Sequence, residues 1–170
     1  MLAPPAVAEL ISFGVKAKMA RAPLQVIVIP FRRDQRGSCE YALFHRTDGS
    51  MWHFVSGGAE DSESAFEAAV REASEEAAIP RTCPWLTLDS NASVARTAFP
   101  LATHWPPDLF VVREHAFAVE VAGHIIGLSR EHDEVRWLPF DEAMDLLTWD
   151  SNRVALWELN ERLNKAALQI

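Results

Sequence analysis

The chain has 170 residues, of which 49% are hydrophobic and 24% are charged. This composition predicts a single globular domain with a substantial buried core, and it excludes an intrinsically disordered chain. The formal net charge of −8 argues against a generic nucleic-acid binder, which would carry a basic surface. An anionic substrate remains compatible with this charge if metal ions or local arginines neutralise it.

Residues 1–21 are apolar and rich in alanine, and some of their apolar residues recur at roughly helical spacing: Val7, Leu10, Ile11 and Val15. A secretory signal would place positive charge before the apolar run, whereas Glu9 interrupts this one. The run is also too short to span a bilayer, so no membrane partner is expected. We predict an N-terminal helix or arm over residues 1–21, and a contact in a homodimer is one role for it.

The two cysteines, Cys39 and Cys83, show neither the spacing of a metal site nor that of a disulfide framework. We therefore expect reduced thiols and a cytoplasmic location.

Three β-rich stretches follow the N-terminal segment. They are residues 24–31, residues 40–46, which alternate in polarity, and residues 52–55, which lead into a pair of glycines.

The stretch from Gly57 to Ile79 carries the strongest chemical signal in the chain. Glu63 follows Gly57 after five intervening residues, and seven more residues separate it from Arg71; the remaining acidic positions are Glu72, Glu75 and Glu76. Phe66, Val70, Ala73 and Ala77 recur at helical spacing and predict a helix with a narrow apolar stripe.

The ends of this helix are marked in the sequence. Ser64 and Glu67 form a capping-box pattern at its start, and Pro80 disfavours helical conformation at the residue before it. Glu72 and Glu76 are one turn apart, so their carboxylates are neighbours that repel each other. A hard divalent cation such as Mg²⁺ or Mn²⁺ would remove this repulsion and would also bind substrate phosphates. Arg71 is expected to reach back and orient Glu63.

The remaining elements follow in order. We predict a short strand over residues 85–88, a loop over 103–108, a long β segment over 109–121, and a shorter strand over 135–138. Two helices are expected at residues 141–147 and 151–167, the second with an apolar stripe of Leu156, Leu159 and Leu163. Strands with an interposed helix and C-terminal helices favour an α/β fold with helices on both faces of a mixed sheet.

The stretch from Gly57 to Ile79 resembles the Nudix box, because six glycine, glutamate and arginine positions are in register. The resemblance implies a Nudix-type α/β/α sandwich with a central mixed β-sheet over residues 22–170. It implies a metal-dependent hydrolase whose Glu72, Glu75 and Glu76 bind the metal. Two departures stand out, since Ala78 occupies a glycine position and Ser56 replaces the proline often found before the two glycines.

A second constellation lies downstream and comprises Glu131, His132, Trp137, Trp149, Ser151 and Asn152. It resembles the C-terminal region of the branch that contains dihydroneopterin triphosphate diphosphatases and dATP pyrophosphohydrolases. This resemblance implies that Glu131 is a further metal ligand. For His132, a loop histidine bonded to backbone is favoured over a role in proton transfer.

The expected substrate-binding residues are Arg21, Arg46, Ser56, Gly57 and Gly58. Arg21 and Ser56 align with positions that contact the triphosphate in this branch, and Arg46 is placed to bind phosphate bidentately. The glycine pair allows close approach of the backbone to a ligand. Among aromatic residues, Phe54 and Phe110 are predicted to be core, whereas Trp105 is left open between the core and base stacking.

The predicted reaction is the hydrolysis of a nucleoside-triphosphate-like substrate, either dihydroneopterin triphosphate or a dNTP, with release of pyrophosphate. Arg71 and Glu63 support the catalytic carboxylates, and Glu75 and Glu131 are the leading candidates for the general base, with Glu134 as a backup. Two alternatives remain open. One is a Nudix hydrolase that acts on ADP-ribose or dinucleoside polyphosphates, and the other is a non-catalytic Nudix-fold nucleotide sensor.

Overall fold

The computed structural model describes residues 21–49, 51–99 and 102–167. The predicted arm over residues 1–21 therefore lies outside the described residues, apart from Arg21. The elements in chain order are β1 (Arg21–Arg33), β2 (Cys39–Arg46), β3 (Trp52–His53), β4 (Val55–Glu60), α1 (Ala65–Ala77), β5 (Trp85–Ala95), the 3₁₀ turn η1 (Arg96–Ala98), β6 (Val111–Glu120), β7 (His132–Leu138), α2 (Phe140–Leu146) and α3 (Asp150–Ala167).

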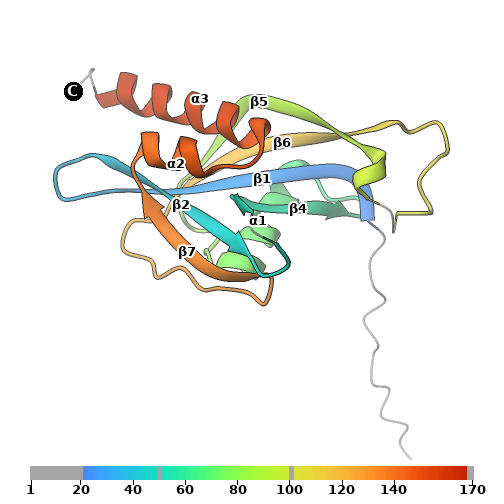
Figure 1. Ribbon diagram of the computed structural model, residues 1–170, viewed down its shortest axis with the longest axis horizontal. Coiled ribbons are helices and arrows are strands. Elements are labelled where there is room, and N and C mark those ends of the chain that lie inside the picture. The colour runs from blue at the N-terminus through green and yellow to red at the C-terminus, as the bar shows by residue number, and fades with distance from the viewer. Residues whose placement is uncertain (1–20, 50, 100–101, 168–170) are drawn as a thin grey trace, which may run out of the picture.

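The strands form one seven-stranded mixed sheet with the main order β3-β2-β1-β6-β5 (Figure 1). Strand β4 pairs with one part of β1, and β7 pairs with β2. The β1–β6 ladder is parallel, whereas the other pairs are antiparallel. Strand β1 is thus the centre of the sheet, and it holds β4 and β6 on its two sides.

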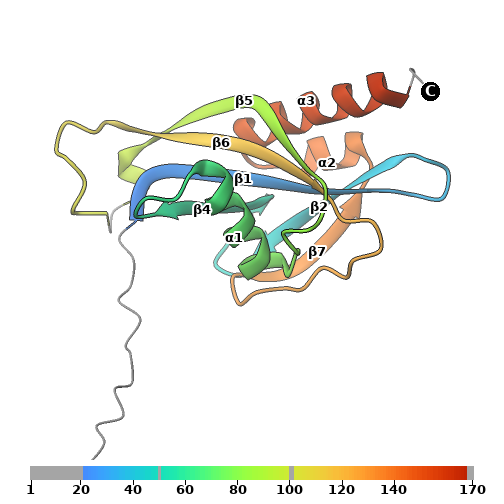
Figure 2. The same ribbon diagram turned by 180° about the vertical axis from the view of Figure 1, so that it is seen from behind.

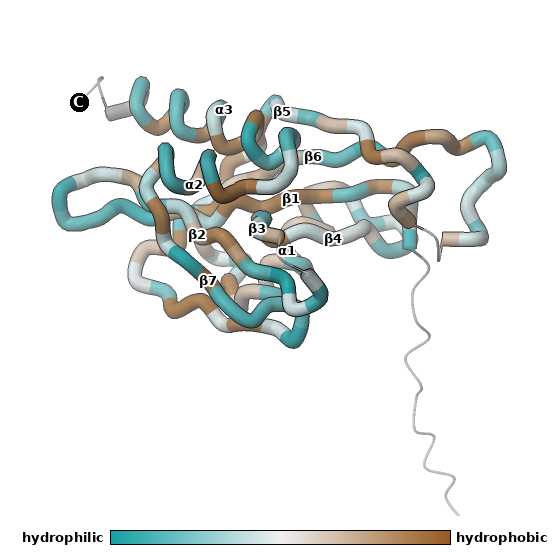
Figure 3. The backbone as a smooth tube through the Cα atoms, in the orientation of Figure 1, coloured by the Kyte–Doolittle hydropathy of each residue, from teal (hydrophilic) through white to brown (hydrophobic). Residues whose placement is uncertain are grey.

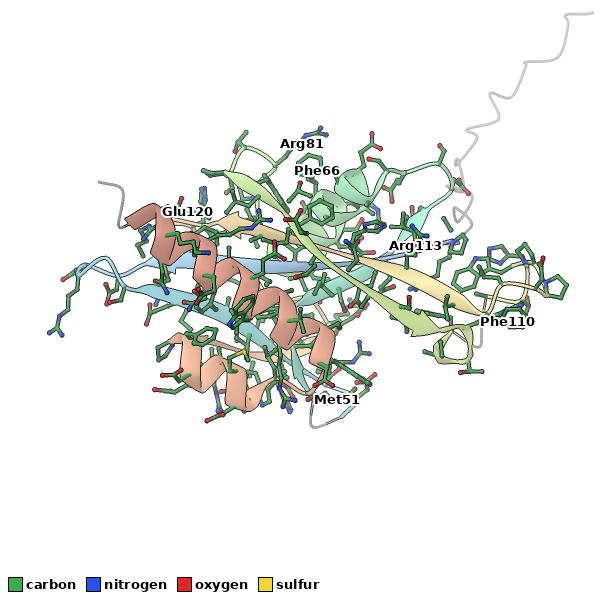
Figure 4. The ribbon with its side chains drawn as sticks, turned by 90° about the horizontal axis from the view of Figure 1, so that it is seen from above. Met51, Phe66, Arg81, Phe110, Arg113 and Glu120 are labelled. Atoms are coloured by element: carbon green, nitrogen blue, oxygen red, sulfur yellow. The ribbon has the colours of Figure 1, made fainter. Side chains whose placement is uncertain are left out.

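Helices cover both faces of this sheet, as the sequence predicts. Figure 2 shows α1 on one face, and Figure 4 shows α2 and α3 on the opposite face. The side chains of β1 alternate between two cores, because successive residues of a strand point to opposite faces. Val26 and Val28 pack in the core under α1, while Ile27 and Ile29 pack in the core under α2 and α3. The apolar middle of β1 stands out in Figure 3.

Helix α1 has the predicted ends. The Ser64 side chain accepts from the Glu67 backbone N–H, and the Glu67 carboxylate accepts from the Ser64 N–H at 2.9 Å. Ala78 ends the helix in the left-handed conformation, with φ 55° and ψ 31°. The buried face of α1 is broader than the predicted apolar stripe, since Ala68 and Ala69 are also fully buried.

Two features differ from the sequence-based predictions, and a third decides the role of Trp105, which the sequence left open. Strand β5 extends to Ala95, well beyond the predicted residues 85–88, because its small and polar second half pairs with β6. Phe110 is 77% exposed and is therefore not a core residue; it lies at the end of the loop between η1 and β6 (Figure 4). Trp105 is buried, and its indole N–H donates to the Arg21 carbonyl at 2.7 Å.

The predictions of burial for Phe54 and for the α3 stripe are confirmed. Phe54 is fully buried, as are Leu156 and Leu159 of the α3 stripe. The two cysteines are free thiols, and burial raises the pKa of each above its ordinary value. Within the described ranges, no helix is long and apolar enough to cross a membrane.

Candidate active site

The two glycines lie inside β4, where side chains press against their Cα atoms. A Cβ atom on Gly57 would lie 2.0 Å from the Glu72 carboxyl carbon, and one on Gly58 would lie 2.6 Å from the Arg21 guanidinium carbon. Neither glycine has a positive φ, so close approach is the reason for glycine at both positions. The close approach brings the Glu72 carboxylate against the β4 backbone.

Arg71 joins the loop before α1 to β4. Its guanidinium donates to both carboxylate oxygens of Glu63, at 2.9 and 3.0 Å, and to the Gly58 carbonyl at 2.8 Å. The predicted contact between Arg71 and Glu63 is therefore present. Arg71 also donates to Glu72 at 3.0 Å and to Glu75 at 3.3 Å. One cation thus fixes the positions of two acidic side chains of the helix.

The carboxylate of Glu76 is buried close to other acidic side chains. Burial, followed by the negative charges of Glu72 and Glu131, raises its pKa to about 8. Burial also raises the pKa of Glu72, although the adjacent Arg71 partly offsets this effect. The structure therefore brings Glu72, Glu76 and Glu131 into one electrostatically coupled neighbourhood. Glu75 differs, because its side chain is 62% exposed.

Glu131 reaches this neighbourhood because the loop before β7 is anchored to the end of α1. The Gly127 N–H donates to the Ala77 carbonyl at 3.0 Å, and the Ser129 N–H donates to the Glu76 carbonyl at 3.1 Å. The Thr47 N–H, at the end of β2, donates to the Glu131 carbonyl at 3.0 Å. Backbone hydrogen bonds thus hold a glutamate that is distant in sequence beside the helix carboxylates.

This donor set fits a hard divalent cation. Carboxylate oxygens are the ligands that Mg²⁺ and Mn²⁺ prefer, and Glu72 and Glu131 place further negative charge near the buried Glu76 carboxylate. Among the described residues, no group of three or more acidic, histidine or cysteine side chains lies close enough together to hold a metal ion as the side chains stand. The carboxylates most suited to hold the cation are Glu72, Glu76 and Glu131, with Glu75 at the exposed side.

A pair of buried histidines adjoins the acidic cluster. The Nε2 atoms of His53 and His132 lie 3.1 Å apart, and His132 Nε2 lies 4.0 Å from Glu76 Oε2. Burial and the neighbouring His132 lower the pKa of His53 to about 4, and burial lowers the pKa of His132. His132 therefore lies at the start of β7 with its ring against His53, instead of binding loop backbone through that ring.

Sequence reasoning did not single out His53. The available signal was a polar residue in the apolar segment Trp52–Val55 immediately before the glycines. Ser56, which follows, contacts both parts of the site: its N–H donates to Glu76 Oε2 at 3.4 Å, and its hydroxyl lies 3.5 Å from His53 Nδ1.

A pocket of about 980 Å³ opens beside these residues on the α3 side of the sheet. Ser56, His53 and Arg46 line it. The Arg46 guanidinium is held bidentately by Asp48, at 2.8 and 2.6 Å. Arg21 adjoins the pocket, with its guanidinium carbon 4.7 Å from the Phe99 ring centroid, and its buried Nε has no hydrogen-bond partner.

The first turn of α3 closes another side of this pocket. Ser151 and Asn152 line it, and the Asn152 side-chain oxygen accepts from the Phe54 N–H at 3.1 Å. The segment from Trp149 to Asn152 thus ties α3 to the strands that precede the glycines. Glu134 is not part of the site, because it pairs with Arg136 on the exposed surface of β7.

The family model for the NUDIX domain matches residues 22–157. The chain therefore belongs to the Nudix family, and it is a Nudix hydrolase. The matched region includes the glycine pair, α1, Glu131, His132 and the first turn of α3, and it begins one residue after Arg21.

Individual members of the family show how similar this chain is to known proteins. It is 40% identical to the solved structure of a chain described as a NUDIX hydrolase from Listeria monocytogenes, with a TM-score of 0.77; the match covers 85% of this chain and 97% of that one. It is 28% identical over 144 residues to the dihydroneopterin triphosphate diphosphatase of Escherichia coli strain K12, covering 84% of this chain and 95% of that protein.

Two further solved structures share the fold at lower identity. The dihydroneopterin triphosphate pyrophosphohydrolase of E. coli matches with a TM-score of 0.66 at 24% identity, over 84% of this chain and 99% of that chain. An Ap4A hydrolase from C. elegans matches with a TM-score of 0.62 at 18% identity, over 85% of this chain and 96% of that chain.

Proposed function

We propose that this Nudix hydrolase cleaves a nucleoside-triphosphate-like substrate, dihydroneopterin triphosphate or a dNTP, into the monophosphate and pyrophosphate. One water is consumed, and its oxygen ends on phosphorus after the phosphoanhydride bond breaks. The observation that carries the proposal is the coupled carboxylate cluster of Glu72, Glu76 and Glu131. Ser56 links this cluster to a large pocket, because its N–H donates to Glu76 and the residue also lines the pocket. The relationship to the E. coli diphosphatase supports the choice of substrate class.

Divalent metal dependence follows from the same cluster. A substrate triphosphate is an anion, and it could not approach these carboxylates without neutralisation. A bound Mg²⁺ or Mn²⁺ would supply that neutralisation and would lower the pKa of a nearby water. Glu72, Glu75, Glu76 and Glu131 are the proposed ligands.

The roles of the other residues follow from their contacts. Arg71 is tied to Glu63 and to the Gly58 carbonyl, so it positions the helix carboxylates and is not itself directed at substrate. Arg21 has a buried donor without a partner beside the pocket, which suits a phosphate oxygen. Glu75 and Glu131 are the proposed candidates for the base that takes the proton from water.

A product-resolved assay tests this proposal. The purified protein is incubated with Mg²⁺ and one substrate at a time: dihydroneopterin triphosphate, each dNTP, ADP-ribose or a dinucleoside tetraphosphate. Pyrophosphate release from the pterin or a dNTP, abolished by chelator, is the expected result. Preference for ADP-ribose or the dinucleotide would keep the Nudix hydrolase assignment and discard the proposed substrate.

Glu76→Gln is the matching variant, because it keeps the shape of the side chain and removes its charge. We expect a loss of metal-dependent turnover of about 100-fold or more with the fold retained by circular dichroism. Glu134→Gln is the control and should behave as the wild type, since Glu134 lies on the exposed surface of β7. Wild-type rates in Glu76→Gln would contradict the assignment of the metal site.

A further inference from the structure

A buried carboxylate that the proposed hydrolysis does not use lines the pocket. Glu114, in the middle of β6, is only 8% exposed and lines the pocket. Its Oε1 atom has no hydrogen-bond partner. Burial raises the pKa of Glu114, and a side-chain hydrogen bond with Ser151 offsets part of that effect. A buried acceptor without a partner is destabilising, so a ligand that supplies a donor would relieve this cost.

The surroundings of Glu114 suit a flat ring. Ile27 and Ala116 belong to the adjoining sheet surface, while Phe99, Trp149 and Val154 contribute apolar walls. Trp149 and Val154 are each more than half exposed, so their apolar surfaces are available to a ligand. An apolar pocket with a few convergent polar groups is the usual form of a small-molecule site.

The strand register places Glu114 relative to the glycine pair of β4. Gln25 of β1 pairs with Gly58 on β4 and with Glu114 on β6. Glu114 therefore lies two strand spacings, roughly 10 Å, from the glycine segment. Ser56 and His53 line the same pocket as Glu114. Because the Ser56 N–H donates to Glu76 and Ser56 also lines this pocket, a ligand with its phosphates beside the acidic cluster would pass Ser56 and extend its heterocycle toward Glu114.

An ionised carboxylate only accepts hydrogen bonds, and its two oxygens match two adjacent N–H donors. A ring N–H beside an exocyclic amino group presents such a pair, and this arrangement occurs in 2-amino-4-oxo heterocycles, namely pterins and guanine. Adenine instead places an acceptor nitrogen beside its amino group, and thymine flanks its N–H with two carbonyls. Each of these two bases would place a hydrogen-bond acceptor against the carboxylate, which is itself an acceptor.

We propose that Glu114 determines substrate specificity by binding the amino and ring N–H groups of a 2-amino-4-oxo heterocycle. The proposal rests on the proposed function, because it concerns the same pocket and the same class of triphosphate. It narrows that class to pterin and guanine triphosphates, and it assigns the choice of ring to one side chain outside the Nudix box.

The variant Glu114→Gln tests this directly. A carboxamide presents one acceptor and one donor, which complements adenine in place of guanine. We expect the ratio of kcat/KM for dGTP to that for dATP to fall by roughly 10- to 100-fold, and the ratio for dihydroneopterin triphosphate to dATP to fall similarly. If Glu114 had a purely structural role, the variant would lower kcat/KM for all substrates by the same factor. Ratios within threefold of those of the wild type would therefore overturn the proposal.

Glu120→Gln is the matched control. It makes the same change in the same strand, but Glu120 is the last residue of β6 (Figure 4). Glu120 is absent from the pocket lining. The substrate ratios should be unchanged in this variant. A change as large as that of Glu114→Gln would mean that the effect comes from charge in general, and it would overturn the proposal.

A binding measurement separates this proposal from the catalytic one. Neopterin carries the ring without phosphates, so its binding, followed by its fluorescence, does not depend on hydrolysis or on metal. The wild type should bind neopterin, and Glu114→Gln should bind it at least about tenfold more weakly. This holds even if no triphosphate in the assay is cleaved. Equal binding by both proteins, or none by the wild type at millimolar neopterin, would overturn the role of Glu114.

Discussion

At the scale of single residues, Ala78 carries a strained backbone conformation. It has a positive φ of 55°, which costs a residue with a Cβ roughly 1 kcal/mol or more. Its N–H still closes the helix on the Ala73 and Ser74 carbonyls. Gly127 packs so closely that a Cβ there would lie 3.0 Å from the Ala78 Cβ. The strain is therefore maintained by the anchoring of the following loop on the helix end.

We expect Ala78→Gly to raise the free energy of unfolding by about 1 kcal/mol, because glycine adopts the left-handed conformation without steric cost. Urea denaturation would measure the change. Ser74→Gly, in the exposed interior of the same helix, is the control and should lower stability by about 0.5–1 kcal/mol. A loss of stability in Ala78→Gly comparable to the control would contradict this interpretation.

At the scale of elements, α3 is fastened to an irregular part of β5. The pairing of β5 with β6 shifts register between Thr87 and Asn91. The Glu158 carboxylate of α3 accepts from the Asp89 and Ser90 N–H groups, each at 2.7 Å. Arg162, one turn further on, pairs with Asp89 at 2.7 Å. The helix thus satisfies the backbone donors that the irregularity frees, and it holds β5 beside the pocket.

Glu158→Ala should lower the free energy of unfolding by about 1–3 kcal/mol, because two backbone N–H groups lose a charged acceptor. Thermal and urea denaturation would both report the loss. Glu161→Ala makes the same change in the same helix outside this contact, and we expect an effect within about 0.5 kcal/mol. Equal effects of the two variants would show that the contact contributes no specific stability.

At the scale of the whole molecule, the acidic cluster links stability to pH and to metal. The pKa of Glu76 in the folded protein, about 8, lies above its ordinary value of 4.5. The folded state therefore holds this proton more tightly than the unfolded chain does. The resulting stabilisation is fully present below pH 4.5 and is lost as the pH rises through about 8.

In chelator, Glu76→Gln should become more stable than the wild type as the pH rises from about 5 to 9, by about 1–3 kcal/mol, because the amide stays neutral. Melting temperatures across this range would show it. Mg²⁺ should raise the melting temperature of the wild type and not that of the variant, since a ligand of the folded state stabilises it. A stability difference independent of pH would contradict the raised pKa.

Much of the local structure could be predicted because it depends on residues close together in the chain. The capping of α1 by Ser64 and Glu67, and the contact of Arg71 with Glu63, each join residues at most eight positions apart. The arrangement of helices on both faces of the sheet could be predicted from the periodicity of the strands and helices.

The roles assigned to the site residues, and a homodimer contact by the N-terminal arm, stay predictions.

The tertiary structure decided which distant groups meet and which are buried. Glu131 joins the acidic cluster because loop backbone binds the end of α1, and His53 meets His132 because β7 pairs with β2. Sequence patterns could not predict the exposure of Phe110 or the buried, unpartnered oxygen of Glu114. The sequence by itself determined helix α1, its caps and the positions of its carboxylates. Capping hydrogen bonds and helical periodicity involve only residues that are close together in the chain. Burial and charge coupling depend on strand pairing across the chain, so only the folded arrangement determined the pocket.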